Sequence, residues 1–226
     1  IQALVNSPQT TKLKQITHAE GNLTHLDLPW NQHGEEREFE IYNSVKMKFC
    51  WVPAGKATLG SPSTERNRHV DEKEHEYVTE VFWLGKYPVT QKQWENVMGE
   101  NPSHFQGGKL PVENVSWQDC QHFLEKCQAT GLKLKLPHED EWEYACRGGV
   151  GNQRAFYWGD TLAGDKANCR SDPYGITILG PSGSRTMDVG SYEKITPLGC
   201  SRAFRIAGFC HAYYWWRNEL PVCWKQ

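Results

Sequence analysis

The chain has 226 residues, with 25 basic and 27 acidic side chains and a formal net charge of −2. This length suits one globular domain with an appended segment, and the balanced charge argues against a basic surface for nucleic acid or for an anionic membrane. The sequence has no run of about 18 apolar residues, and its first residues lack the pattern of a secretory signal, so it predicts no membrane span and no particular compartment.

Eight cysteines stand at positions 50, 120, 127, 146, 169, 200, 210 and 223, and no two of them form a C-x-x-C pair. Zinc-ribbon and thioredoxin-like sites are therefore not supported. The even count leaves disulfides open. Cys120 and Cys127 are seven residues apart on the apolar side of a predicted helix. We expect these two to be small buried residues.

The N-terminal third combines a polar segment with predicted strands. Residues 1–38 are polar and mixed, and we interpret them as a linker or an incomplete upstream segment. Alternating patterns over residues 39–42 and 47–52 predict two half-buried strands, and Pro53-Ala54-Gly55 turns the second into a strand over 57–60. Residues 61–76 are too charged for a core, and residues 77–84 predict one further strand.

Three short helices are predicted next. Thr90 and Gln93 form a capping box at the start of the first helix, and Gly99 suits its C-terminal cap. Ser116 begins the second, whose apolar residues share one stripe. These residues are Trp117, Cys120, Phe123, Leu124 and Cys127. The third covers residues 139–146, where three acidic residues suit the positive N-terminal end of a helix.

The remainder of the middle region is not periodic. Between residues 152 and 192, the many Gly, Asp, Asn and Pro residues predict ordered loops more than strands. The whole pattern indicates an α+β fold with few short helices, short strands and much irregular structure.

Ordered motifs along the chain resemble those of a known family. They are Trp51-Val52-Pro53-Ala54-Gly55, Tyr87-Pro88-Val89-Thr90, residues 110–117, residues 136–145 with Arg147-Gly148-Gly149, Tyr157-Trp158-Gly159-Asp160, Ala167-Asn168-Cys169 and Val189-Gly190-Ser191-Tyr192. The stretch is similar to the formylglycine-generating enzyme, or sulfatase-modifying factor, domain, a variant of the C-type lectin-like fold. The resemblance implies a domain over residues 39–193, followed by an atypical segment over 194–226.

The resemblance also implies an activity, and the end of the chain departs from it. Catalytic members resemble copper-dependent oxidases that convert a sulfatase cysteine to formylglycine at two thiolates about five residues apart. After Tyr192 the sequence has no Gly-Asn-Val-Trp-Glu-Trp, Arg-Gly-Gly-Ser or closing Gly-Phe-Arg segment. Cys200 and Cys210 stand ten residues apart. They remain open as buried thiols, a disulfide or a copper pair, so no catalytic residue is assigned and no copper site matches.

Two further metal sites come into question. The resemblance implies calcium at the Asn168 side chain and the Cys169 carbonyl. Calcium takes about six to eight oxygens, but the loop over 180–185 has no acid at the family's position. Asp172 is a candidate substitute, and the alternative is a loop held by Asn168 hydrogen bonds. His69 and His75 have five residues between them, unlike the His-x-x-x-His-x-Glu iron motif of related sulfoxide synthases, so we expect a charged loop there.

Three functional hypotheses follow. The main one is a formylglycine-generating enzyme domain, acting on a sulfatase or other protein, that is inactive because its catalytic cysteine segment is not recognisable. The second is a non-catalytic ligand- or protein-binding module that displays the aromatic run Tyr213-Tyr214-Trp215-Trp216. The third is a change of reading frame near residues 195–198. A missing closing strand would leave a sheet edge that favours pairing with other chains.

Overall fold

The computed structural model describes residues 2–6, 35–65, 70, 72–149 and 185–191, and every structural statement below concerns these residues. Their strands form a five-stranded sheet in the order β2-β3-β6-β1-β7 and a two-stranded sheet of β4 and β5. The strands are β1 (Leu4–Asn6), β2 (Glu36–Tyr42), β3 (Val45–Val52), β4 (Gly55–Leu59), β5 (His75–Thr79), β6 (Phe82–Gly85) and β7 (Leu134–Lys135).

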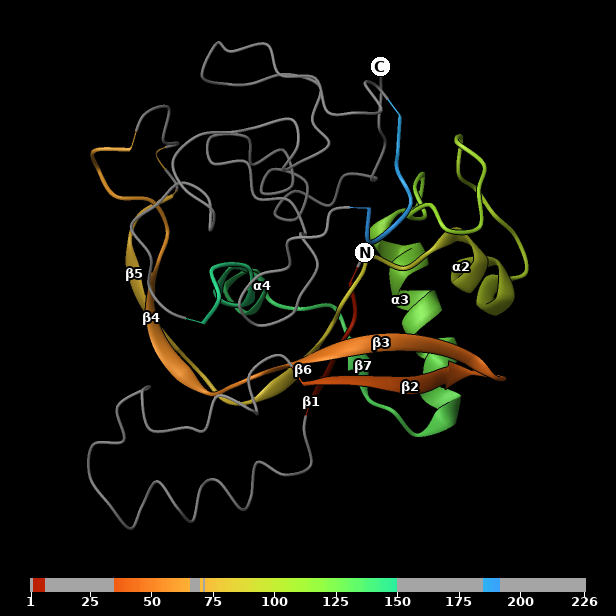
Figure 1. Cartoon of the computed structure of the whole chain (residues 1–226), viewed down its shortest axis with the longest axis horizontal. Coiled ribbons are helices and arrows are strands. Elements are labelled where there is room, and N and C mark those ends of the chain that lie inside the picture. The colour runs from red at the N-terminus through yellow and green to blue at the C-terminus, as the bar shows by residue number, and fades with distance from the viewer. Residues whose placement is uncertain (1, 7–34, 66–69, 71, 150–184, 192–226) are drawn as a thin grey trace.

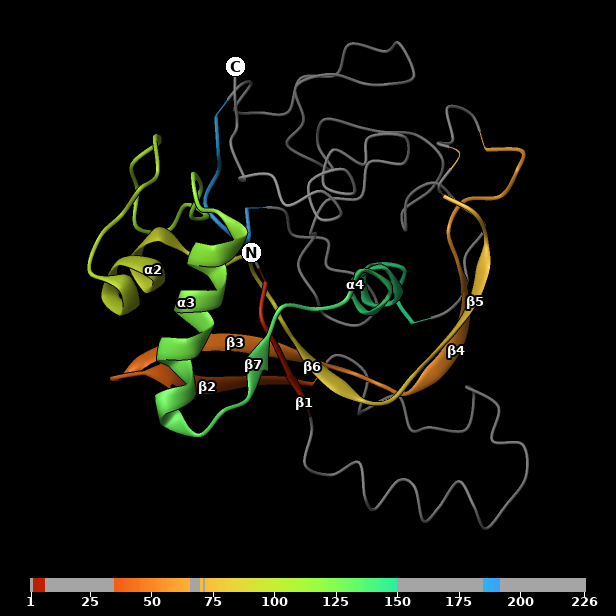
Figure 2. The same ribbon diagram turned by 180° about the vertical axis from the view of Figure 1, so that it is seen from behind.

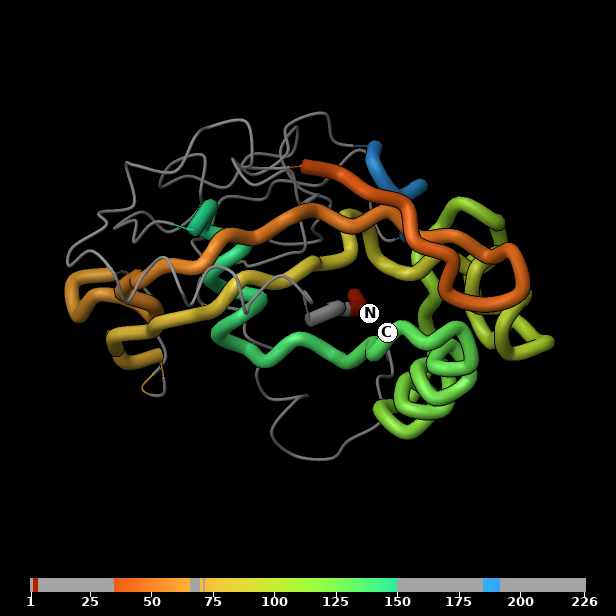
Figure 3. Tube along the Cα trace, turned by 90° about the horizontal axis from the view of Figure 1, so that it is seen from below, coloured from red at the N-terminus to blue at the C-terminus, as the bar shows by residue number. Residues whose placement is uncertain are grey.

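The same two stretches of chain, residues 45–59 and 75–85, pair antiparallel in both sheets. β3 pairs with β6, where Trp51 lies opposite Trp83, and β4 pairs with β5, where Ala57 lies opposite Tyr77. Figure 3 shows the orange chain of β2 to β4 and the yellow chain of β5 and β6 side by side along the molecule. We call the two-stranded sheet the β4–β5 arm, and it curves away from the larger sheet at the left of Figure 1.

The prediction of one strand over residues 77–84 was wrong. The structure has two strands there, β5 and β6, which belong to different sheets and are separated by Glu80 and Val81. β5 pairs with β4, whereas β6 pairs with β3 and β1. β6 is fully buried and β5 is largely exposed, but strand-forming residues continue through both, so local sequence alone carries no sign of the change of partner.

The helices largely follow the predicted signals. They are α2 (Gln91–Met98), α3 (Trp117–Cys127), the 3₁₀ helix η2 (Gln128–Thr130) and α4 (Glu139–Cys146). Capping boxes are present at Thr90 and Ser116, and Gly99 takes a left-handed φ of 91° after α2. His138 caps α4, which the sequence did not indicate; its side chain accepts a hydrogen bond from the Asp140 backbone N–H.

The five-stranded sheet has a core on each face. Because successive strand residues point to opposite sides, Phe49 and Trp51 of β3 join the cluster that includes α2 and α3, whereas Cys50 and Val52 join the cluster that includes α4. Figure 2 shows α3 crossing in front of the sheet, beside α2. The prediction for Trp117 was wrong: its side chain is 50% exposed, because the buried stripe of α3 begins one turn later, at Cys120.

A short strand from the N-terminal segment lies inside the larger sheet. β1 pairs antiparallel with β6 on one side and with β7 on the other, and Figure 3 shows it in red between the yellow and green chains. The sequence did not predict this strand, because three residues are too few to establish a periodic pattern. None of the described helices is both long and apolar enough to cross a bilayer.

Candidate functional site around helix α4

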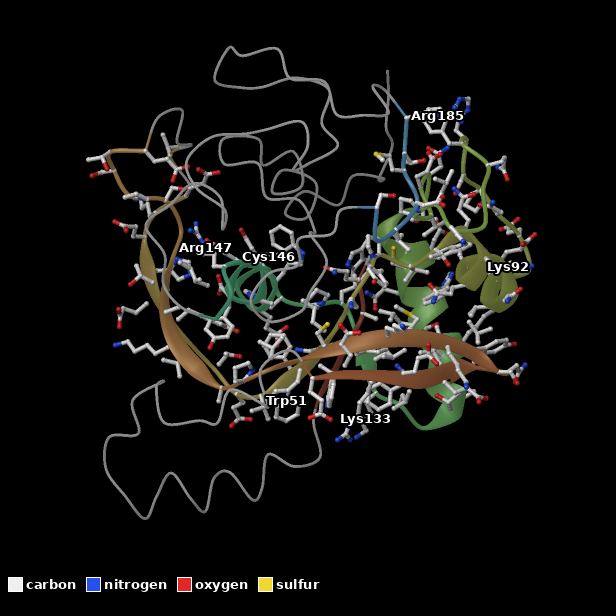
Figure 4. The ribbon with its side chains drawn as sticks, viewed as in Figure 1. Trp51, Lys92, Lys133, Cys146, Arg147 and Arg185 are labelled. Carbon is white, nitrogen blue, oxygen red and sulfur yellow. The ribbon has the colours of Figure 1, made fainter. Side chains whose placement is uncertain are left out.

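A buried ion pair joins the C-terminal half of α4 to the β4–β5 arm. Glu143 and Arg147 are four residues apart on α4, their side chains are each 7% exposed, and Arg147 Nε lies 2.6 Å from Glu143 Oε1. The Gly60 N–H donates to the same carboxylate oxygen at 3.0 Å, and Arg147 Nη2 donates to the Gly60 carbonyl at 2.8 Å. Figure 4 shows Arg147 at the end of α4 that faces the arm. The pair therefore holds both backbone polar groups of Gly60.

Gly60 is required at this contact for two reasons. Its φ of +85° lies in the left-handed region that favours glycine, and a Cβ there would lie 2.4 Å from the Lys73 carbonyl oxygen. The next residue, Ser61, donates its N–H to the Glu72 carbonyl at 3.0 Å and its hydroxyl to the Glu72 carboxylate at 3.3 Å. Ser61 and Glu72 are buried. The expectation of a wholly solvated charged loop over residues 61–76 was therefore wrong at these two positions.

A histidine–carboxylate pair lies at the other end of α4. His75 of β5 places its Nε2 3.0 Å from Asp140 Oδ1 and its Nδ1 3.2 Å from the Lys73 carbonyl. Partial burial lowers the pKa of His75, but the Lys73 carbonyl and the Asp140 and Glu143 carboxylates together outweigh it and raise that pKa above 6.5. Because both ring nitrogens face oxygen acceptors, the charged imidazolium is the form that satisfies both contacts.

This pair predicts a pH-dependent contribution to stability. Because the folded-state pKa of His75 is raised, its contribution is complete below pH 6.5 and is lost as the pH rises through the folded-state value. We expect His75→Gln to lower the free energy of unfolding near pH 5 by an amount below about 1 kcal/mol, because the pair is partly exposed. The loss near pH 9 should be smaller than the loss near pH 5. Thermal unfolding at the two pH values measures this, with His122→Gln, an exposed histidine on α3, as the control. An equal loss at both pH values would contradict the assignment.

A buried tyrosine completes the α4 side of the site. Tyr144 is fully buried, its ring centroid lies 6.0 Å from that of Tyr77, and its hydroxyl has no hydrogen-bond partner among the residues that the structure describes. Burial raises the pKa of Tyr144 to about 12. The hydroxyl is therefore neutral at physiological pH and is not suited to act as a base.

A second polar network lies on α2 and orders the loop that follows it. Gln91 is 1% exposed; its Nε2 donates to the Phe105 carbonyl at 2.7 Å, and its Oε1 accepts from Asn101 Nδ2 and the Gly107 N–H, both at 3.0 Å. Each end of this buried amide has a partner, so the loop is fixed to the helix.

The last described segment of the chain, residues 185–191, contacts this loop. The Val189 N–H donates to the Lys109 carbonyl at 2.9 Å, and the Arg185 guanidinium lies 5.8 Å from the centre of the Phe105 ring. Figure 4 shows Arg185 far from Arg147, beside this loop. The scaffold thus fixes residues 185–191, which closely precede the segment over 194–226 that is expected from the sequence to be atypical.

Two of the described cysteines, Cys120 and Cys127, do not suit a copper site. Cys120 and Cys127 are buried, as expected. Burial raises the pKa of the Cys120 thiol, and it raises that of Cys127 to about 12. Copper(I) binding uses thiolates, which these environments disfavour. No group of three or more His, Cys, Asp or Glu side chains in the described part of the chain could hold a metal ion.

The predicted metal residues lie outside the described residues. Asn168 and Cys169 belong to that part, as do Asp172, His69 and the cysteines at 200, 210 and 223. Calcium at Asn168 and Cys169 therefore stays a prediction. Sequence reasoning missed Glu143 and Arg147, although their spacing of four residues at the end of a predicted helix was a usable signal. Their contact with Gly60 could not be predicted from the sequence.

Comparison with known proteins identifies the family. The sulfatase-modifying factor enzyme 1-like domain matches residues 40–220, which include the motifs on β3, α2, α3 and α4. The chain belongs to this family. The match continues through much of the C-terminal segment whose composition differs from that of the preceding domain. Family membership accounts for the shared scaffold of small sheets and few short helices.

Individual relatives include active and inactive enzymes. The chain is 35% identical over 115 residues to the chaperone protein LppX of Paenibacillus barcinonensis and 40% identical over 81 residues to the formylglycine-generating enzyme of Mus musculus. These alignments cover 34% and 36% of this chain, and 40% and 19% of the respective relatives. It is also 32% identical over 88 residues to the inactive Cα-formylglycine-generating enzyme 2 of Bos taurus, covering 39% of this chain and 26% of that protein.

Solved structures support the fold. Variable protein 1 of Treponema denticola aligns with a TM-score of 0.58 at 24% identity, over 74% of this chain and 72% of that one. PvdO from Pseudomonas aeruginosa aligns with a TM-score of 0.57 at 20% identity, over 75% of this chain and 70% of that one. These likenesses confirm a mixed α and β architecture of the family type.

Proposed function

We propose that this chain is a protein-binding member of the sulfatase-modifying factor family that engages a sulfatase-type segment without oxidising it. The observation that carries the proposal is the cysteine spacing after Tyr192. Cys200, Cys210 and Cys223 are separated by ten and thirteen residues, whereas the family oxidases resemble copper enzymes with two thiolates about five residues apart. No two cysteines of this chain have the spacing of that copper-binding pair.

The relatives support a role in protein recognition. One is named a chaperone protein and another an inactive formylglycine-generating enzyme, so these names associate the scaffold with roles other than catalysis. One fold can host several functions, and the residues of the site decide which function a protein has. The scaffold described here supplies order, since the Glu143–Arg147 pair fixes the β4–β5 arm and the Gln91 amide fixes the loop beside residues 185–191.

Binding is tested with a fluorescent peptide that contains the sequence Cys-x-Pro-x-Arg. We expect its anisotropy to rise to saturation as the purified chain is added, and to do so equally with and without copper. A peptide with the Arg replaced by Glu is the matched control, and it should bind at least about tenfold more weakly, a difference of about 1.4 kcal/mol. Absence of saturable binding by the first peptide would contradict the proposal.

Oxidation is the second candidate function. The identity of 40% over 81 residues to the mouse formylglycine-generating enzyme favours it, although that alignment covers 19% of the mouse protein. Burial disfavours the thiolate form of Cys120 and Cys127, so these two are poor copper ligands. Loss of the peptide thiol in the presence of copper-loaded protein distinguishes this candidate from binding alone.

A further inference from the structure

The middle of the larger sheet contains a slot that a separate segment fills. β1 lies between β6 and β7, with Leu4 opposite both Leu84 and Lys135 and Val5 opposite Trp83. The Gly85 N–H also donates to the Ala3 carbonyl at 2.7 Å. Residues 2–6 are therefore held on both sides by the backbone of other strands, as an inserted peptide strand would be.

The entry to this slot selects for particular side chains. Ala3 is fully buried, and a Cβ on Gly85 would lie 3.3 Å from both the backbone N and the carbonyl O of Ala3. Gln2 is 7% exposed; its Nε2 donates to the Gly85 carbonyl at 2.9 Å, and its Oε1 accepts from Trp142 Nε1 at 3.1 Å. Both ends of the Gln2 amide are engaged, so the slot matches an extended strand that carries glutamine followed by a small residue.

The slot belongs to the scaffold, whereas the strand that fills it does not. β1 lies outside residues 40–220, which match the family, and residues 7–34 separate it from the next described segment. The described sheet pairing of β7, a strand of two residues, is with β1. Filling the slot therefore also joins β7, and the chain leading into α4, to the rest of the sheet.

From this arrangement we propose that the slot between β6 and β7 is an acceptor site for an extended peptide strand, and that residues 2–6 of a second copy of this chain can replace the chain's own strand there. All the contacts described above are made by residues 2–6 and by the strands and Trp142 that surround them. The same segment of another copy can make identical contacts, which is the condition for strand exchange between identical chains. The inference does not depend on the proposed binding of a sulfatase-type peptide.

Two variants of the full chain separate the strand from the slot. Ala3→Asp places a charge at a fully buried position, so it disables the strand and leaves the slot intact. Gly85→Val places side-chain atoms against the Ala3 backbone, so it disables the slot and leaves the strand intact. We expect each variant alone to be monomeric, and the equimolar mixture to give a dimer of the two variants in size-exclusion chromatography with light scattering. A mixture that remains monomeric would overturn the proposal.

A peptide experiment tests the same site when a variant folds poorly. A synthetic peptide of residues 1–8 should bind the Ala3→Asp chain, raise its thermal midpoint and show saturable fluorescence anisotropy. The same peptide carrying the Ala3→Asp change is the control. It should neither bind the Ala3→Asp chain nor raise its thermal midpoint. The wild-type chain should bind the peptide at least about tenfold more weakly than the Ala3→Asp chain does. Its own residues 2–6 already fill the slot, so only the fraction of molecules whose slot is open can bind the peptide. If the wild-type peptide fails to stabilise the Ala3→Asp chain, the acceptor site is refuted.

Discussion

Replacing Arg147 by methionine is expected to lower the free energy of unfolding by about 3–5 kcal/mol. The change leaves the carboxylate of Glu143 buried without the guanidinium that lies 2.6 Å away, and it removes the donor to the Gly60 carbonyl. A buried charge that loses its partner keeps its full desolvation cost. Chemical denaturation of the variant and the wild type measures the difference.

Two further variants sharpen this prediction. The double variant Glu143→Gln with Arg147→Met removes both charges, and we expect it to be more stable than Arg147→Met alone. Arg37→Met is the exposed control: Arg37 pairs with Glu35 at 54% and 40% side-chain exposure, so its loss should cost no more than about 1 kcal/mol. A cost for Arg147→Met no larger than that of Arg37→Met would show that the pair does not hold the arm.

Replacing Phe123 by alanine is expected to cost about 3–5 kcal/mol. Phe123 is fully buried on α3, and its ring stacks on that of Trp94 with centroids 5.1 Å apart and an interplanar angle of 3°. Truncation removes this contact and leaves a cavity between α2 and α3, so both lost transfer free energy and lost packing contribute. Denaturant unfolding at equilibrium measures the loss.

The matched control lies on the same helix. Trp117→Ala removes a larger aromatic ring, but that side chain is 50% exposed, and we expect a cost below about 1 kcal/mol. The comparison tests where the buried stripe of α3 begins. Equal losses for the two variants would mean that Trp117 also belongs to the core.

Local signals in the sequence predicted the helices well. Thr90 with Gln93 and Ser116 with Asp119 are capping boxes in both sequence and structure, because each needs only residues three positions apart. The burial of Cys120 and Cys127 was confirmed for a similar reason, since a helical stripe is a short-range pattern. The family resemblance was confirmed by the match over residues 40–220.

Features that depend on distant partners could not be predicted from the sequence. The chain between Tyr77 and Leu84 changes sheet because its two halves pair with different strands. The contact of Gly60 with Glu143 joins residues 83 positions apart, and its geometry follows from the packing of α4 on the β4–β5 arm. The calcium prediction at Asn168 and Cys169 concerns a loop outside the described residues, so it remains a prediction.

The central claim is that this member of the family binds a protein segment without oxidising it. The most direct test incubates the copper-loaded chain, in the presence of oxygen, with the Cys-x-Pro-x-Arg peptide at saturating concentration and follows the peptide by mass spectrometry. The account predicts that the peptide keeps its cysteine thiol, and that a chain with Cys200→Ser and Cys210→Ser gives the same result. Conversion of the cysteine to formylglycine by the wild-type chain, abolished in the double variant, would contradict it.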